Sequence, residues 1–207
     1  MIDTAVLVRP FDNHTNQWNF GIDHAQTPWV LCIDADYVCP KEFQQEVELL
    51  EPKCDAYFAA FRYLINGRPL KATLYPPRAV LFRKARFRYV ADGHTQLLNV
   101  EGAKIGTLKS VIDHDDRKAL AHWLASQSKY AVLEAEKLAS STPANLGWKD
   151  RLRLQIAFAP FLTAVYCLFW RLLILDGRAG LFYTLQRVYA ELLLSLELLD
   201  RKLKREE

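Results

Sequence analysis

Runs of apolar residues, some alternating with polar positions and some recurring at helical spacing, predict short strands and helices over the first two thirds of the chain. Residues 29–33 form an unbroken apolar run, which is typical of a strand buried on both faces of a sheet. Asn13 and Pro40 each stand where a helix with one apolar face begins. Strands that alternate with helices in this way predict an α/β fold. Further strands are predicted at residues 5–8, 56–65, 79–83, 95–100 and 111–113, and a third helix at residues 117–139.

One tight turn carries a strong signal of its own. Asn66-Gly67 follows the long predicted strand at residues 56–65, and this dipeptide favours a two-residue hairpin turn because both positions accept positive φ. We therefore expect a strand that returns over residues 68–75.

The composition changes after residue 142. Residues 140–147 are rich in Ser, Thr, Pro, Asn and Gly, as in a linker. Residues 154–175 are then almost wholly apolar, Asp176-Gly-Arg-Ala-Gly180 predicts a break, and a second helix with apolar and charged faces is expected over residues 181–204. We place a domain boundary here, with residues 1–142 on one side and residues 143–207 on the other.

The C-terminal region has features of a membrane-associated helical hairpin. Its uninterrupted apolar part, residues 156–170, is shorter than the roughly 20 residues that a spanning helix needs. The net charge of +3 arises entirely in residues 143–207, which hold 10 basic and 7 acidic side chains. We favour a hairpin in the membrane interface over a helical pair buried against the first domain, and both over a single span.

Charge and cysteine usage limit the other classes of function. Residues 1–142 carry 17 basic and 17 acidic side chains, and no groove of aromatic and basic residues is recognisable, so we expect no nucleic acid partner. The four cysteines form no Cys-x-x-Cys pair and do not suggest an extracellular disulfide framework. The first residues do not have the pattern of a signal peptide, and we expect none. We expect the protein on the cytoplasmic side, held to a membrane surface by its C-terminal region.

Two carboxylates follow the apolar run at residues 29–33. Ligands of open α/β sheets bind beyond the carboxyl ends of strands, and Asp34 and Asp36 stand at such an end. Two aspartates one residue apart can hold a hard divalent cation and through it a diphosphate. Acidic residues also cap helices, and a helix is expected after Pro40. From these residues alone, metal binding and helix capping stay equal alternatives.

Two later polar clusters offer further candidates. Asp92 and His94 flank a glycine and could act as a general base, although a simple β-turn explains the same spacing. His114 follows a predicted strand and could be a third metal ligand if the fold brings it near Asp36. We interpret Asp115 and Asp116 as caps of the helix that follows.

A group of basic residues along the predicted strands could meet phosphate or an anionic acceptor, although alternate residues of solvated strands would look the same. Its members are Arg62, Arg68, Lys71, Arg78, Arg83, Lys84, Arg86 and Arg88.

Six short motifs follow one another along the chain. They are Asn19-Phe-Gly-Ile-Asp, Trp29-Val-Leu-Cys-Ile-Asp-Ala-Asp, Leu74-Tyr-Pro-Pro-Arg, Asp92-Gly-His-Thr-Gln, His114-Asp-Asp-Arg-Lys and Asp176-Gly-Arg-Ala-Gly. Taken in this order, they resemble the bacterial family 2 glycosyltransferases of lipopolysaccharide-core and surface-polysaccharide synthesis. The resemblance implies a GT-A fold with a Rossmann-like mixed sheet, a nucleotide-sugar donor, a lipid-linked saccharide acceptor and inversion at the anomeric carbon by one displacement. It also implies that Asp34 and Asp36 hold Mn²⁺ or Mg²⁺, and that the enzyme works at the cytoplasmic face of the inner membrane.

The sequence departs from this family at three places. Tyr37 and Thr95 stand where related sequences often have Glu, which makes Asp92 the first and His94 the second candidate for the base that activates the acceptor. The family's nucleotide-binding part lies upstream of the position matched by residues 5–8, so we expect an N-terminally truncated core with an uncovered sheet edge. The alternative function is an inactive, membrane-associated scaffold. A weaker third option is a metal-dependent phosphohydrolase using Asp34, Asp36 and His114.

Overall fold

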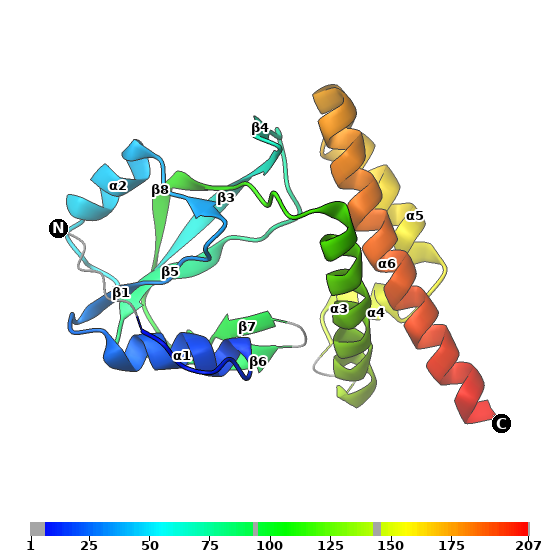
Figure 1. Cartoon of the computed structure of the whole chain (residues 1–207), viewed down its shortest axis with the longest axis horizontal. Helices are drawn as coiled ribbons and strands as arrows, with labels where there is room; N and C mark the ends of the chain where they lie inside the picture. Colours follow the sequence, from blue (N-terminus) through cyan, green and yellow to red (C-terminus); the bar gives the residue numbers. More distant parts are fainter. Residues whose placement is uncertain (1–6, 93–94, 143–145, 207) are drawn as a thin grey trace. The chain divides into compact units, whose positions relative to one another are not determined.

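The structure, a computed structural model, describes residues 7–92, 95–142 and 146–206 (Figure 1). The chain divides into two compact units. Unit 1 consists of Met1–Leu64 and Thr73–Asp116, and unit 2 consists of Ile65–Ala72 and Arg117–Glu207.

A mixed sheet forms the centre of unit 1, with the strand order β1-β5-β3-β8-β2. β3 and β8 are parallel, whereas β1 with β5, β3 with β5, and β2 with β8 are antiparallel. The predicted α/β fold with a mixed sheet and flanking helices is confirmed. The strands are β1 (Trp29–Leu31), β2 (Tyr37–Val38), β3 (Ala56–Ile65), β5 (Arg78–Arg83) and β8 (Ile105–His114).

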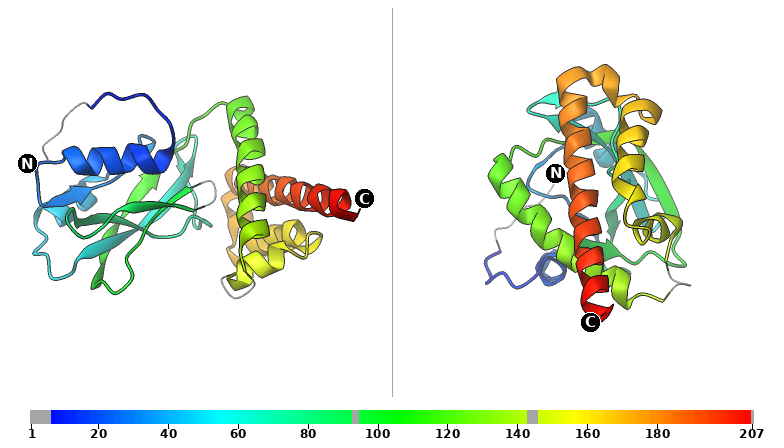
Figure 2. Two further views of the ribbon diagram at one scale, coloured as in Figure 1. Left: turned by 90° about the horizontal axis from the view of Figure 1, so that it is seen from below. Right: turned by 90° about the vertical axis from the view of Figure 1, so that its right-hand side faces the viewer.

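Helices cover both faces of this sheet (Figures 1 and 2). On one face, Phe43 of α2 (Lys41–Glu48) is buried against Phe61 and its neighbours. On the other, Ile22 of α1 (His14–His24) packs with Phe82. Because side chains of a strand alternate between faces, β3 contributes to both cores. The ribbon of β6 (Tyr89–Asp92) and β7 (Thr95–Leu98) joins the α1 side.

The strand preceding the two aspartates differs from its prediction. β1 covers three residues, all half-buried, and in the described sheet it is the edge strand paired antiparallel with β5. The expectation of a strand buried on both faces was therefore wrong, since an apolar run does not distinguish an edge from an interior position. Of the strand predicted at residues 5–8, Leu7 and Val8 lie in no strand and are exposed, and residues 5 and 6 lie outside the described residues.

Most local signals in unit 1 have the predicted outcome. Asn13 caps α1, its side-chain oxygen accepting the N–H of Asn16 at 2.8 Å. α2 begins directly after Pro40. Further along the chain, at the start of unit 2, Asn66 and Gly67 take the positive φ of a hairpin turn, but the strand after them, β4 (Arg68–Pro69), is only two residues long. Pro69 has no N–H to donate to a ladder, which limits that strand.

Unit 2 is helical apart from its short segment Ile65–Ala72. α6 packs against α3 and α5 (Figure 2). Leu138 of α3 and Leu194 and Leu198 of α6 form its apolar core. Beside this core, Arg153 donates to Glu191 at 2.7 Å and to Glu134 at 3.4 Å. The elements are α3 (Leu120–Ser140), α4 (Trp148–Arg153), α5 (Phe158–Val165), a π-helical turn η2 (Tyr166–Trp170), a 3₁₀ turn η3 (Leu173–Asp176) and α6 (Gly177–Glu206).

The break between the last two helices lies earlier than predicted. Leu172 takes a left-handed φ of 56°, and α6 begins at Gly177 and runs through Gly180. A Cβ added to Gly180 would lie 1.9 Å from the carbonyl oxygen of Leu173, so this glycine allows close packing and does not end a helix. Among the described residues, no single helix is long and apolar enough to cross a membrane. One pair, Phe158–Trp170 with Leu173–Lys204, passes that test together but is bent by 72°.

Candidate active site

Strand pairing brings the two acidic loops of unit 1 together. In the register of β2 and β8, Tyr37 lies opposite His114 and Val38 opposite Asp113. The backbone N–H of Asp115 also donates to the carbonyl oxygen of Asp36 at 3.3 Å. The loop after β1 and the loop after β8 therefore meet at one end of the sheet.

Three potential metal ligands converge at this point. One side-chain ligand atom from each of Asp36, His114 and Asp116 lies within 4.8 Å of the others. His114 Nε2 is 3.5 Å from Asp36 Oδ2. His114 is only 9% exposed, and its Nδ1 has no hydrogen-bond partner among the described residues. A largely buried imidazole that groups with two carboxylates, its Nε2 beside Asp36, fits a divalent cation that accepts mixed oxygen and nitrogen ligands, such as Mn²⁺.

An aromatic frame holds the imidazole of His114. The rings of Tyr37, Tyr63 and Tyr75 lie 5.0, 4.7 and 5.1 Å from it, centroid to centroid. The hydroxyl groups of Tyr37 and Tyr75 hydrogen-bond to each other. Burial raises the pKa of both phenols, so both stay neutral. Tyr37 thus supplies a packing ring to this site.

Asp34 lies in the same loop but outside this group of three. Its carbonyl oxygen accepts the N–H of Tyr37 at 3.1 Å. Burial raises the pKa of Tyr37, Tyr75 and Tyr89, and the negative charge of Asp34 raises it further. The Asp34 carboxylate therefore lies near these three phenols. Metal ligation by Asp34 stays a prediction.

The acidic pair after His114 differs from its interpretation as helix caps. α3 begins at Leu120, its N-cap residue is Ala119, and no side chain caps it. Capping by Asp115 or Asp116 was therefore wrong, because three further residues separate Asp116 from the helix. Asp116 belongs to the metal-ligand group instead. The sequence feature that could have indicated this role is His114-Asp115-Asp116 at the end of a strand.

The two candidate bases belong to the β6–β7 ribbon. Asp92 ends β6 and pairs in register with Thr95. His94 lies outside the described residues. The side-chain amide of Asn19, from the first quoted motif, bonds both the N–H and the C=O of Tyr89 at 2.9 and 3.0 Å. Asn19 thereby attaches this ribbon to α1, and the base role of Asp92 and His94 stays a prediction.

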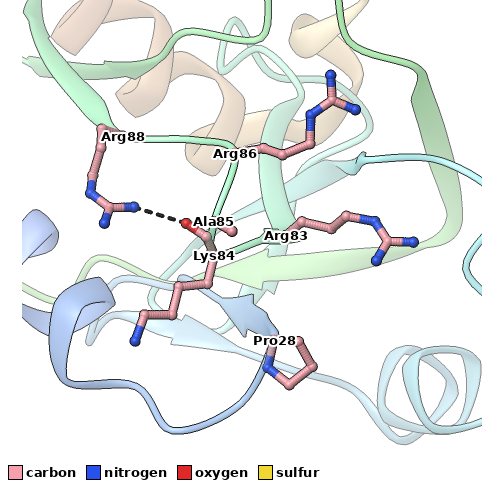
Figure 3. A pocket seen from close by; sticks show the side chains of 6 residues that line it. All are labelled: Pro28, Arg83, Lys84, Ala85, Arg86 and Arg88. Carbon is pink, nitrogen blue, oxygen red and sulfur yellow. Dashed lines mark hydrogen bonds between the residues drawn. The ribbon is translucent and has the colours of Figure 1, made fainter.

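A pocket of about 250 Å³, lined mainly by basic residues, lies at the turn after β5 (Figure 3). The charged ends of these residues do not converge. The side chains of Arg83 and Arg86 both reach Asp55, at 3.8 and 2.5 Å. Lys84 and Arg88 point to the other side, where Lys84 donates to the carbonyl oxygen of Ala25 and Arg88 to Asp23. The pocket is lined by Pro28, Arg83, Lys84, Ala85, Arg86 and Arg88.

A mixed α/β sheet with flanking helices and an Asp-His-Asp group beyond its strand ends is consistent with a GT-A-like fold. The sequence model of glycosyl transferase family 2 matches residues 3–113, which is more than half of the chain. The chain therefore belongs to glycosyl transferase family 2. No curated protein matches it.

Proposed function

We propose that this glycosyltransferase moves a sugar from a nucleotide donor to a lipid-linked saccharide, with inversion, in bacterial cell-surface polysaccharide synthesis. Family membership supports the nucleotide-sugar donor. The observation that carries the proposal is the convergence of Asp36, His114 and Asp116. Asp36 lies within residues 3–113, which match the family, and His114 and Asp116 follow that range closely. The ordered motifs and the apolar C-terminal helices support the acceptor and the bacterial context.

In this proposal, Asp36, His114 and Asp116 would hold Mn²⁺ or Mg²⁺, with Asp34 beside them. The bound cation would neutralise charge that develops on the leaving nucleoside diphosphate. The protein's own part is to fix the ligands. β2–β8 pairing sets the distance between the two loops, and the tyrosine rings hold the imidazole.

Asp92 is the first and His94 the second candidate to accept the proton from the acceptor hydroxyl. A carboxylate or neutral imidazole near neutral pH has the basicity that this step requires. Attack by the deprotonating hydroxyl oxygen on the anomeric carbon, opposite the departing diphosphate, inverts the configuration in one displacement.

The C-terminal region, residues 143–207, is proposed to hold the enzyme at the cytoplasmic face of the inner membrane as a peripheral or monotopic protein. Phe161, Phe169 and Trp170 are 68, 60 and 79% exposed. α6 also carries an exposed apolar stripe at helical spacing, and basic residues flank the helices. A lipid-linked acceptor would lie in the same interface. The stripe consists of Leu181, Leu185, Tyr189, Leu192, Leu196, Leu199 and Leu203.

Metal binding by the full-length chain tests the proposal. We expect Asp36→Asn and Asp116→Asn to weaken Mn²⁺ binding, measured by calorimetry, at least about 10-fold, since each removes one charged ligand. The matched control is Asp113→Asn. Asp113 is adjacent to His114, but Arg62 holds its carboxylate with two hydrogen bonds of 2.7 and 2.8 Å, so Mn²⁺ affinity should not change.

Activity assays separate the proposal from its alternatives. Wild-type protein should consume a UDP-, GDP- or dTDP-sugar only with an acceptor and Mn²⁺ or Mg²⁺, and Asp36→Asn should abolish this. Release of sugar without any acceptor would indicate a phosphohydrolase. A cellular polysaccharide phenotype that survives Asp36→Asn would favour the inactive scaffold. Absence of Mn²⁺ binding in the wild-type chain would refute the proposed metal site.

A further inference from the structure

Arg78 differs from the other arginines of β3, β5 and the turn after β5 in having no anionic partner. Within the described residues, the side chain of Arg78 makes no hydrogen bond or ion pair, and its guanidinium carbon lies 4.8 Å from the ring centroid of Tyr75. It is half-buried. A guanidinium has five N–H donors, and stacking on a ring satisfies none of them. The partnered arginines are Arg62 with Asp113, Arg83 and Arg86 with Asp55, and Arg88 with Asp23.

The position of Arg78 connects it with the metal-ligand group. Arg78 is the first residue of β5, and the antiparallel register of β5 with β1 puts it at the end of the sheet where the chain leaves β1 for Asp34. The Tyr75 ring under its guanidinium also lies 5.1 Å from the His114 ring. Arg78 and the imidazole therefore contact the same phenol.

The charges around this phenol favour a ligand that bridges two cations. Asp36 and Asp116 suit a divalent cation, and Arg78 offers a second positive charge over the ring of Tyr75. The planar guanidinium donates two parallel hydrogen bonds to phosphate oxygens, which a lysine does not match. The hydrogen bond between Tyr75 and Tyr37 fixes the ring on which the guanidinium rests.

We propose that Arg78, oriented by Tyr75, binds phosphate oxygens of the donor's diphosphate and holds that group during its departure. The inference rests on the proposed function, because it assigns the bridging ligand to the nucleotide-sugar donor. Phosphate on an acceptor shares the same chemistry, so the test has to separate these two sources.

The probe is inorganic pyrophosphate, titrated into the full-length chain by calorimetry with and without Mn²⁺. We expect Arg78→Gln to weaken pyrophosphate binding about 10- to 100-fold in the presence of Mn²⁺, the range expected for charge-assisted hydrogen bonds. Mn²⁺ affinity itself should not change. The matched control is Arg83→Gln at the other end of β5. Arg83 also stacks on an aromatic ring, that of Trp29 at 4.7 Å, but it has Asp55 as partner, so pyrophosphate affinity should not change.

The outcomes distinguish this inference from the proposed function. Unchanged pyrophosphate affinity in Arg78→Gln, or a wild-type chain that does not bind pyrophosphate, overturns the role of Arg78 whatever happens to Mn²⁺. Failure of the wild-type chain to bind Mn²⁺ refutes the metal site. In that case, the pyrophosphate affinities of the wild type and Arg78→Gln measured without Mn²⁺ decide the role of Arg78. Equal losses for pyrophosphate and inorganic phosphate, both independent of Mn²⁺, overturn the assignment to the donor. Arg78→Lys, with an unchanged thermal unfolding midpoint, should bind with intermediate affinity and replaces Arg78→Gln if that variant does not fold.

Discussion

Replacement of Gly180 by alanine tests how the helical hairpin of unit 2 is built. Alanine is the better helix former by about 1 kcal/mol, so intrinsic propensity predicts a gain in stability. The structure predicts the opposite, since the new Cβ would lie 1.9 Å from the Leu173 oxygen and 3.0 Å from the Asp176 Cβ. A backbone carbonyl cannot rotate away as a flexible side chain can, so η3 has to move.

The magnitude follows from what this movement disturbs. Leu173 is fully buried, which contributes about 1.5–3 kcal/mol, and overpacking costs about 1–3 kcal/mol. Asp176 also accepts the backbone N–H of Lys71 at 2.9 Å, which anchors the segment Ile65–Ala72 within unit 2. After subtraction of the helix-propensity gain, we expect Gly180→Ala to lower the free energy of unfolding by roughly 1.5–5 kcal/mol.

Urea denaturation followed by circular dichroism measures this difference, with Gly21→Ala as the matched control. Gly21 lies inside α1 of unit 1, and a Cβ added there meets no atom within 4 Å. Gly21→Ala should therefore raise the free energy of unfolding by about 0.5–1 kcal/mol. A Gly180→Ala protein as stable as the wild type would refute the close approach of α6 to η3.

Two further predictions concern acid stability and membrane binding. Burial raises the pKa of Glu46, but the hydrogen bonds from the backbone N–H groups of Lys109 and Ser110 lower it more, so the net pKa lies below the ordinary 4.5. The ionised Glu46 carboxylate therefore stabilises the folded protein above that pH, and this stabilisation is lost as the pH falls through the folded-state pKa. Glu46→Gln should lower the free energy of unfolding by about 1–3 kcal/mol at pH 7. In thermal scans, the difference from the wild type should become smaller below about pH 4.5. In flotation with anionic vesicles, Phe169→Glu should weaken binding roughly 10- to 100-fold, whereas Leu49→Glu, an equally charged change on unit 1, should not. Equal flotation of both variants, or a concentration-dependent dimer in place of vesicle binding, would argue against the membrane surface.

Local signals determined most of the fold because they act over a few residues. The cap at Asn13, the start of α2 at Pro40 and the long strand Ala56–Ile65 each follow from neighbours in sequence. Features that depend on distant parts of the chain were not predictable in this way. Whether residues 29–33 lie at an edge depends on which strands pair with them, and whether Gly180 breaks a helix depends on what packs against it.

The candidate site shows the same division more sharply, because its assembly depends on the register of a two-residue strand. A period-2 pattern cannot be recognised over Tyr37–Val38, yet a shift of one residue along β8 would move Tyr37 away from His114 and Asp36 with it. Tyr37 prevents this shift, since its ring packs on Phe61 and His114 and its hydroxyl bonds that of Tyr75. Tyr37, one of the residues that depart from the family pattern, therefore fixes the register on which the metal-ligand group depends. Substitution of Tyr37 by the family's glutamate would add a carboxylate and remove that packing at once.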